Sequence, residues 1–202
     1  YFRLFDLVQG IPVLINTGET YPSLVTEGAS LSFTMQGIAS STVTEGVTVD
    51  VTTAANAVPY GRLSIGADIE AAQRLSVSTN APEGYQIYMT TDGDFLSASG
   101  DTIAPITTTN ASPAAWTTGC DSGATGCFGY HTGDDNLSGG SIRFFAPDTY
   151  ARFSTTTLDE VVYGGGPVAT DTVDMIYKVS IKQLQEAGQY AARIRYIAVP
   201  VF

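Results

Sequence analysis

Alternation of apolar and polar residues with a period of two recurs along this chain and constrains its fold more than any other feature. In the run ASLSFTMQG, Leu31, Phe33 and Met35 occupy every second position. Successive side chains of a β-strand point to opposite faces, so this pattern is typical of a strand with one face on a core. No segment keeps the 3.6-residue period of an amphipathic helix beyond two turns. The sequence therefore predicts an all-β protein.

Similar runs predict the other strands of an antiparallel β-sandwich, of jelly-roll or immunoglobulin-like type, over residues 24–202. They are GVTVDVTT (46–53), RLSVSTN (74–80), YQIYMTTDGD (85–94), SIRFFA (141–146), DEVVYG (159–164), DMIYKVSIK (174–182) and GQYAARIRYIAVPVF (188–202). The turn residues NAPEG lie where 74–80 meets 85–94, so we expect these two strands to form a hairpin. A chain of 202 residues is long enough for one such domain.

Residues from about 97 to 140 are rich in Gly, Asp, Thr and Asn and show no sustained period. This composition predicts long loops on the surface of the sandwich. Within them we expect short strands around Ile103 and Phe128, and one helical turn at SPAAW (112–116), where Ser112 can cap and Pro113 can take the first position.

The first fifteen residues, YFRLFDLVQGIPVLI, include ten large apolar residues and precede the polar run NTGETYPS (16–23). Pro12 disfavours a helix, and polar residues interrupt the run too often for a membrane span of about 20 apolar residues. We therefore expect an extended N-terminal strand over 1–15, followed by a linker over 16–23. Because the sequence begins with Tyr1 rather than Met, we also expect that a leader has been removed.

Large apolar side chains occupy both alternating positions of this N-terminal strand. One set is Phe5, Leu7, Ile11, Val13 and Ile15, and the other is Phe2, Leu4, Val8 and Leu14. A strand that is apolar on both faces is typical of one covered on both faces. It can be the first strand of its own sandwich, or it can pair with a neighbouring subunit, and the sequence leaves both alternatives open.

The two cysteines, Cys120 and Cys127, lie seven positions apart in WTTGCDSGATGCFGY. A disulfide between them is the preferred interpretation, because the cysteine count is even and the spacing closes a short loop. A metal site is the competing interpretation, but two thiols with one His in the whole chain leave the ligand set incomplete. The disulfide predicts an oxidising compartment and hence a secreted protein on the cell surface.

The net charge of −11 argues against partners that are themselves anionic, so we expect neither nucleic acid nor an anionic membrane. The chain has no G-x-S-x-G, H-E-x-x-H or P-loop motif. His131, in GYHTGDD, lacks a nucleophile motif beside it, so we expect a surface residue rather than a catalytic one. The acidic clusters TDGDF and GDDN lack calcium-loop spacing. We therefore predict no enzyme, no metal and no cofactor.

The run 47–94 and the C-terminal stretch YKVSIKQLQEAGQYAARIRYIAVPVF resemble exported bacterial surface proteins of β-sandwich type. The ending, with A-G-x-Y before a final alternating strand, resembles the closing hairpin of WxL-type cell-wall-binding proteins and of spore-coat-U-like pilins. Tyr196-Ile197-Ala198 stands where a W-x-L motif would be expected, so the resemblance does not imply wall binding through that motif. The resemblance to pilins implies that an N-terminal strand is donated to a neighbouring subunit.

These features together predict a structural subunit of an extracellular fibre or pilus, a homopolymer assembled head to tail by N-terminal strand donation. The alternative is a monomeric surface adhesin or carbohydrate-binding domain with surface glycans as partners. For that alternative the candidate ring platforms are Tyr21, Tyr60, Trp116 and Tyr130.

Overall fold

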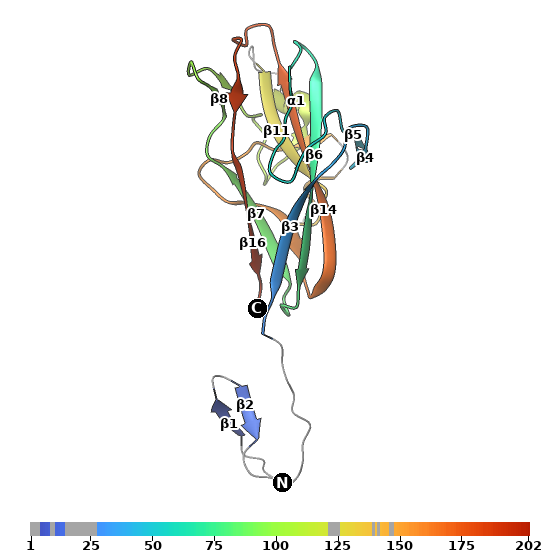
Figure 1. Cartoon of the computed structure of the whole chain (residues 1–202), viewed down its shortest axis with the longest axis vertical. Coiled ribbons are helices and arrows are strands. Elements are labelled where there is room, and N and C mark those ends of the chain that lie inside the picture. Colours follow the sequence, from blue (N-terminus) through green and yellow to red (C-terminus); the bar gives the residue numbers. More distant parts are fainter. Residues whose placement is uncertain are drawn as a thin grey trace.

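Two antiparallel β-sheets packed face to face form the body of the protein in a computed structural model (Figure 1). The structure describes residues 5–8, 11–14, 28–120, 126–138, 140, 142–145 and 148–202. The larger sheet contains, in spatial order, β11 (Gly126–Thr132), β14 (Val168–Ile181), β6 (Asp68–Thr79) and β3 (Leu31–Gly37). The smaller sheet contains β13 (Asp159–Gly164), β7 (Tyr85–Thr91) and β16 (Ile194–Pro200). The predicted all-β sandwich is confirmed.

Shorter elements surround these two sheets. The strands are β4 (Val43–Thr44), β5 (Val47–Thr48), β8 (Phe95–Ser97), β9 (Thr102–Ile103), β10 (Ala114–Ala115), β12 (Thr149–Tyr150) and β15 (Tyr190–Ala191), and the helix is α1 (Trp116–Cys120). Near the N-terminus β1 (Phe5–Val8) pairs with β2 (Ile11–Leu14). Within the described part of the chain no helix is long and apolar enough to cross a membrane.

The main core lies between the two sheets and follows the period-two pattern. Every second residue of β7 from Tyr85 to Thr91 is buried, and Leu75 and Val77 of β6 and Tyr177 of β14 lie in the same core. The alternation that marked these strands therefore reports the face of each strand that the opposite sheet covers.

A second apolar cluster covers the outer face of the larger sheet. Ala72 of β6 and Ile176 of β14 point away from the main core and pack with Trp116, Tyr150 and the cysteine pair. Lys178 Nζ lies 5.2 Å from the Trp116 ring centroid and 5.3 Å from that of Tyr150. It also pairs with Glu70 at 3.0 Å. The second half of β14, from Asp174 to Ser180, is consequently covered on both faces, with Lys178 half-buried.

Two expectations about strand pairing and one about loops are wrong. β6 and β7 lie in different sheets and do not form a hairpin. The intervening chain crosses between the sheets at Gly84, where φ is +81° and an added Cβ would overlap the carbonyl oxygen of Gly164. The C-terminal strands β14 and β16 likewise lie in different sheets, so the expected closing hairpin is absent from the described residues. The strands predicted at 74–80 and 85–94 instead pack face to face. The hairpin prediction failed because alternation specifies a buried face but not a hydrogen-bonded neighbour.

The third concerns residues 97–140, where the sequence predicted long exposed loops. β11 runs through this stretch, is buried along its whole length, and pairs with β14 from Gly126↔Ile181 to Thr132↔Met175. Two shorter predictions here are confirmed, the strands at Ile103 and Phe128, whereas the helical turn begins at Trp116 rather than at Ser112. SIRFFA is not a strand over its described residues 142–145.

Cys120 and Cys127 form a disulfide, with their Cα atoms 5.6 Å apart. It joins the end of α1 to β11 within the outer apolar cluster, so it links α1 covalently to the larger sheet.

Replacing both cysteines with alanine should lower the free energy of unfolding by about 2–3 kcal/mol, because the bond closes a short loop in the unfolded chain. Urea unfolding of the two proteins, each checked for thiol content, measures this difference. Free thiols in the wild-type protein would contradict the disulfide.

Candidate functional site

The outermost strands β3 and β16 lie on the same side of the sandwich, one from each sheet (Figure 1). Among the strands that the structure describes, β3 pairs with β6 and β16 pairs with β7, each along one edge. The opposite edges of β3 and β16 border a gap between the two sheets. An exposed strand edge is a template for pairing with a further strand.

The backbone groups that point to this gap follow from the ladder on the other side of each strand. Asp92 N donates to Arg193 O at 3.1 Å, and Val201 N donates to Gly84 O at 2.8 Å. Alternate residues of an antiparallel strand bond to the same neighbour, so the odd-numbered residues of β16 bond to β7. Ile194, Tyr196 and Ala198 therefore direct their backbone groups to the gap.

The same reasoning applies to β3. Asn80 N donates to Ser30 O at 3.4 Å, which places the even-numbered residues of this segment on the β6 side. Leu31, Phe33 and Met35 then direct their N–H and C=O groups to the gap. Both edges thus offer backbone donors and acceptors at the residues whose side chains point into the sandwich.

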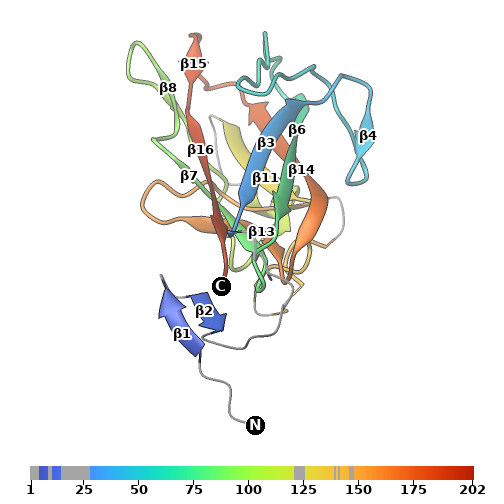
Figure 2. The same ribbon diagram turned by 60° about the horizontal axis from the view of Figure 1, so that its bottom comes forward.

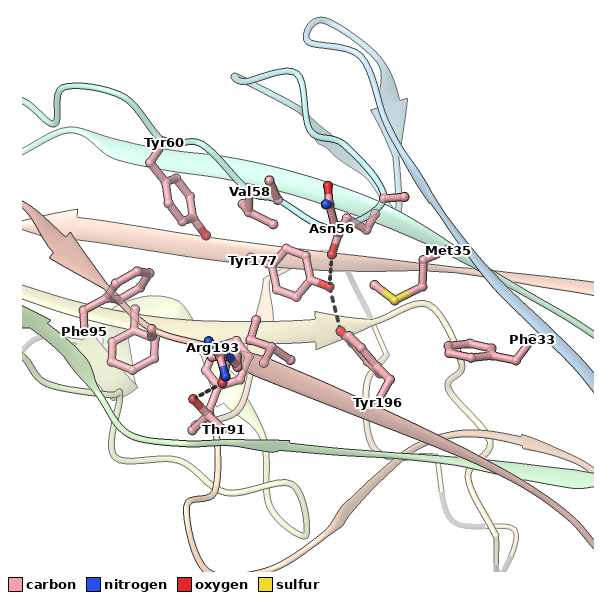
Figure 3. Close-up of a pocket in the computed structure, with 17 residues that line it drawn as sticks. Phe33, Met35, Asn56, Val58, Tyr60, Thr91, Phe95, Tyr177, Arg193 and Tyr196 are labelled. Atoms are coloured by element: carbon pink, nitrogen blue, oxygen red, sulfur yellow. Dashed lines mark hydrogen bonds between the residues drawn. The ribbon is translucent and has the colours of Figure 1, made fainter.

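A cavity of about 510 Å³ opens between these edges (Figure 3). We call this cavity and the two edges the β3–β16 groove. Its lining is mostly apolar and aromatic and comes from both sheets and from the segment 55–60; it comprises Phe33, Met35, Ala55, Asn56, Ala57, Val58, Tyr60, Gln73, Thr91, Phe95, Phe128, Phe153, Tyr177, Ala192, Arg193, Ile194 and Tyr196.

The inward side chains of the edge strands are covered less completely than those of the central strands. Phe33, Met35, Ile194 and Tyr196 are half-buried, whereas the inward residues of β7 are fully buried. The apolar surface of the sandwich therefore continues into the groove, where a further strand would cover it.

A hydrogen-bonded set of polar side chains lies within the mostly apolar lining of the groove. Tyr177 donates its hydroxyl hydrogen to Gln73 Oε1 at 2.9 Å, and the Tyr177 and Tyr196 hydroxyl oxygens lie 2.6 Å apart. Since the Tyr177 proton is engaged with Gln73, Tyr196 is the donor of that second bond. Burial raises the pKa of Tyr177 and of Tyr196, so both hydroxyls are neutral.

The described part of the N-terminal segment, β1 and β2, lies outside this groove. β1 and β2 pair with each other, with Phe5 opposite Leu14 and Val8 opposite Ile11, and form a separate two-stranded sheet. In Figures 1 and 2 the hairpin lies beyond the end of the sandwich that carries the C-terminus. The predicted single extended strand over 1–15 is therefore wrong for the described part of this segment.

A sequence signal for this hairpin exists. Gln9 and Gly10 separate the two strands, and a two-residue connection containing glycine is a typical hairpin length and composition. Of the predicted interaction residues, Phe5, Leu7 and Val8 belong to β1, and Ile11, Val13 and Leu14 belong to β2. Phe2, Leu4 and Ile15 lie outside the described residues.

Two of the four candidate ring platforms for a glycan are inaccessible. Trp116 and Tyr130 are buried, and Tyr60 lines the groove. Tyr21 lies outside the described residues. Over the described ranges, no group of three or more His, Cys, Asp or Glu side chains is placed to hold a metal ion.

His131 is buried, contrary to the expected surface position. Its Nδ1–H donates to the carbonyl oxygen of Thr149 at 2.8 Å, and its ring contacts Phe144 and Tyr150. Burial lowers the pKa of His131, more than the Thr149 carbonyl and the charges of Asp135 and Glu70 raise it.

The unfolded chain takes up a proton at His131 more readily than the folded protein, so stability should fall as the pH drops from about 7 through the ordinary histidine pKa of about 6.5. A His131→Gln variant, which keeps a donor for Thr149, should lose part of this pH dependence. Urea unfolding of both proteins between about pH 7.5 and about pH 5.5 measures the difference. Parallel curves would show that His131 does not contribute. The half-buried Asp134 and Asp159, whose pKa values desolvation raises, act in the opposite direction in both proteins.

Comparison of the chain with protein-family models and with curated proteins found no match.

Proposed function

We propose that this protein is a structural subunit of an extracellular surface fibre, in which the N-terminal segment of one copy adds a strand in the β3–β16 groove of the next. The observation that carries the proposal is the groove itself: two open strand edges on one side of a sandwich, with an apolar cavity between them. An added strand gains backbone hydrogen bonds from such edges and burial from such a cavity.

The N-terminal segment has the composition that this groove requires. Apolar residues dominate β1 and β2, and an extended segment of seven residues, about 23 Å long, matches β3 and β16, which have seven residues each. The segment also pairs outside the body of its own chain, which favours a neighbouring copy over its own groove.

A contact between an arm and a groove uses two different surfaces of the subunit. Such a head-to-tail contact does not close on itself, so repetition of it produces a filament. The disulfide between Cys120 and Cys127 supports an oxidising, extracellular location for that filament.

Deleting residues 1–15 should abolish filament formation and leave a subunit with an open apolar groove. Electron microscopy and sedimentation velocity of the full and truncated proteins test this. A synthetic peptide of residues 1–15 should bind the truncated protein and raise its melting temperature. Filaments formed by the truncated protein would overturn the proposal, and so would a full-length protein that stays monomeric at high concentration.

Donation as a straight strand requires the β1–β2 hairpin to open. Asp6 and Val13 are opposite one another in this hairpin, so cysteines at both positions can form a bond that locks it. The oxidised Asp6→Cys/Val13→Cys variant should not assemble, and a mild reductant should restore assembly. The wild-type protein in the same reductant and the single Asp6→Cys variant are the controls. Assembly of the locked variant would show that the segment is not donated as a straight strand.

A further inference from the structure

The two faces of the N-terminal segment differ once it is extended. The odd-numbered positions from 5 to 13 carry Phe, Leu, Gln, Ile and Val, whereas the even-numbered positions from 4 to 14 carry Leu, Asp, Val, Gly, Pro and Leu. A strand in the β3–β16 groove points one of these sets inward. We propose that the odd-numbered side chains enter the groove, and that Gln9 of the donated strand hydrogen-bonds to the Tyr196 hydroxyl. This inference rests on the function proposed above.

The charge of Asp6 makes the even-numbered face unfavourable for burial in the groove. With that face inward, the carboxylate of Asp6 would enter an aromatic cavity, and an unpaired buried charge is strongly unfavourable. Among the residues that line the cavity, Arg193 is the cation, but its side chain is 76% exposed and 4.0 Å from Asp92. With the odd-numbered face inward, Asp6 and Pro12 lie on the solvent side.

The hydrogen-bonded tyrosine hydroxyls of the groove match Gln9, the one polar residue at the odd-numbered positions from 5 to 13. Tyr196 donates its hydroxyl hydrogen to Tyr177, and no described residue donates to the Tyr196 oxygen, which keeps acceptor capacity. A glutamine amide supplies the missing donor. A seven-residue strand centred on Gln9 also places Leu7 and Ile11 on either side of it, where Phe33, Met35 and Ile194 form the apolar lining.

Leu7→Asn and Val8→Asn in the full-length protein separate the two faces, because the residues are adjacent and similar in size but of opposite parity. Leu7→Asn should raise the concentration at which filaments form by at least about tenfold, since it puts an amide in an apolar site, while Val8→Asn should raise it less than about threefold. The reverse order would overturn the assignment of faces.

A double-mutant cycle tests the hydrogen bond. Gln9→Leu should raise the assembly concentration by about three- to tenfold in the wild-type background and have almost no effect beside Tyr196→Phe, where the partner hydroxyl is gone. Tyr60→Phe is the matched control, because it removes another hydroxyl of the groove and should leave the effect of Gln9→Leu unchanged. Independent, multiplying effects of Gln9→Leu and Tyr196→Phe would reject the bond. Unfolding curves of the unassembled variants show whether Tyr196→Phe has weakened the subunit itself.

Failure of this inference is distinguishable from failure of the proposed function. If deletion of residues 1–15 stops assembly while Val8→Asn is more damaging than Leu7→Asn, strand donation stands and the assigned face is wrong. If deletion has no effect on assembly, strand donation is wrong and the inference falls with it.

Discussion

Burial of β14 on both faces is the interaction on which the rest of the structure depends. Its inward residues Met175 and Tyr177 pack against the smaller sheet, while Ile176 on the opposite face anchors the outer cluster around Trp116. The same strand pairs with β6 and with β11, so it positions the larger sheet as a whole. The Tyr177 hydroxyl in the groove is a consequence of this placement, since a central strand holds its side chain rigidly between the two layers.

The groove arises because each sheet ends in an open strand edge on the same side of the sandwich, at β3 in the larger sheet and at β16 in the smaller one. β6 and β7 have neighbours on both sides, whereas the side chains of β3 and β16 are only half-buried at the open edges. Open edges promote unwanted association, and natural sandwiches usually cover or blunt them. Here the exposed edges combine with an aromatic cavity, which fits a surface used for specific strand addition. Pairing of β1 with β2 satisfies backbone groups of the N-terminal segment while the subunit is alone.

Individual strands were predictable because their chemistry is local. The alternation in β3, β7 and β16 appears directly in the burial of Phe33, Ile87 and Tyr196. For β11 the sequence predicted only a short strand around Phe128, because both faces of β11 are covered and its sequence GCFGYHT therefore shows no alternation. The N-terminal hairpin was missed for another reason. The same apolar residues suit one long strand or two short ones, and the glycine in Gln9–Gly10 is a weak turn signal between them.

The sequence by itself determined that the chain is built of strands and which face of most strands is buried, and it favoured the disulfide between Cys120 and Cys127 that the structure contains. These properties depend on neighbouring residues and on short spacings along the chain. Only the tertiary structure decided that β6 and β7 belong to opposite sheets, that His131, Trp116 and Tyr130 are buried, and that β3 and β16 border one groove. The physical reason is that alternation specifies a face but not a partner. Strand neighbours and open edges follow from contacts between residues far apart in the chain, and those form only when both sheets close on their common core.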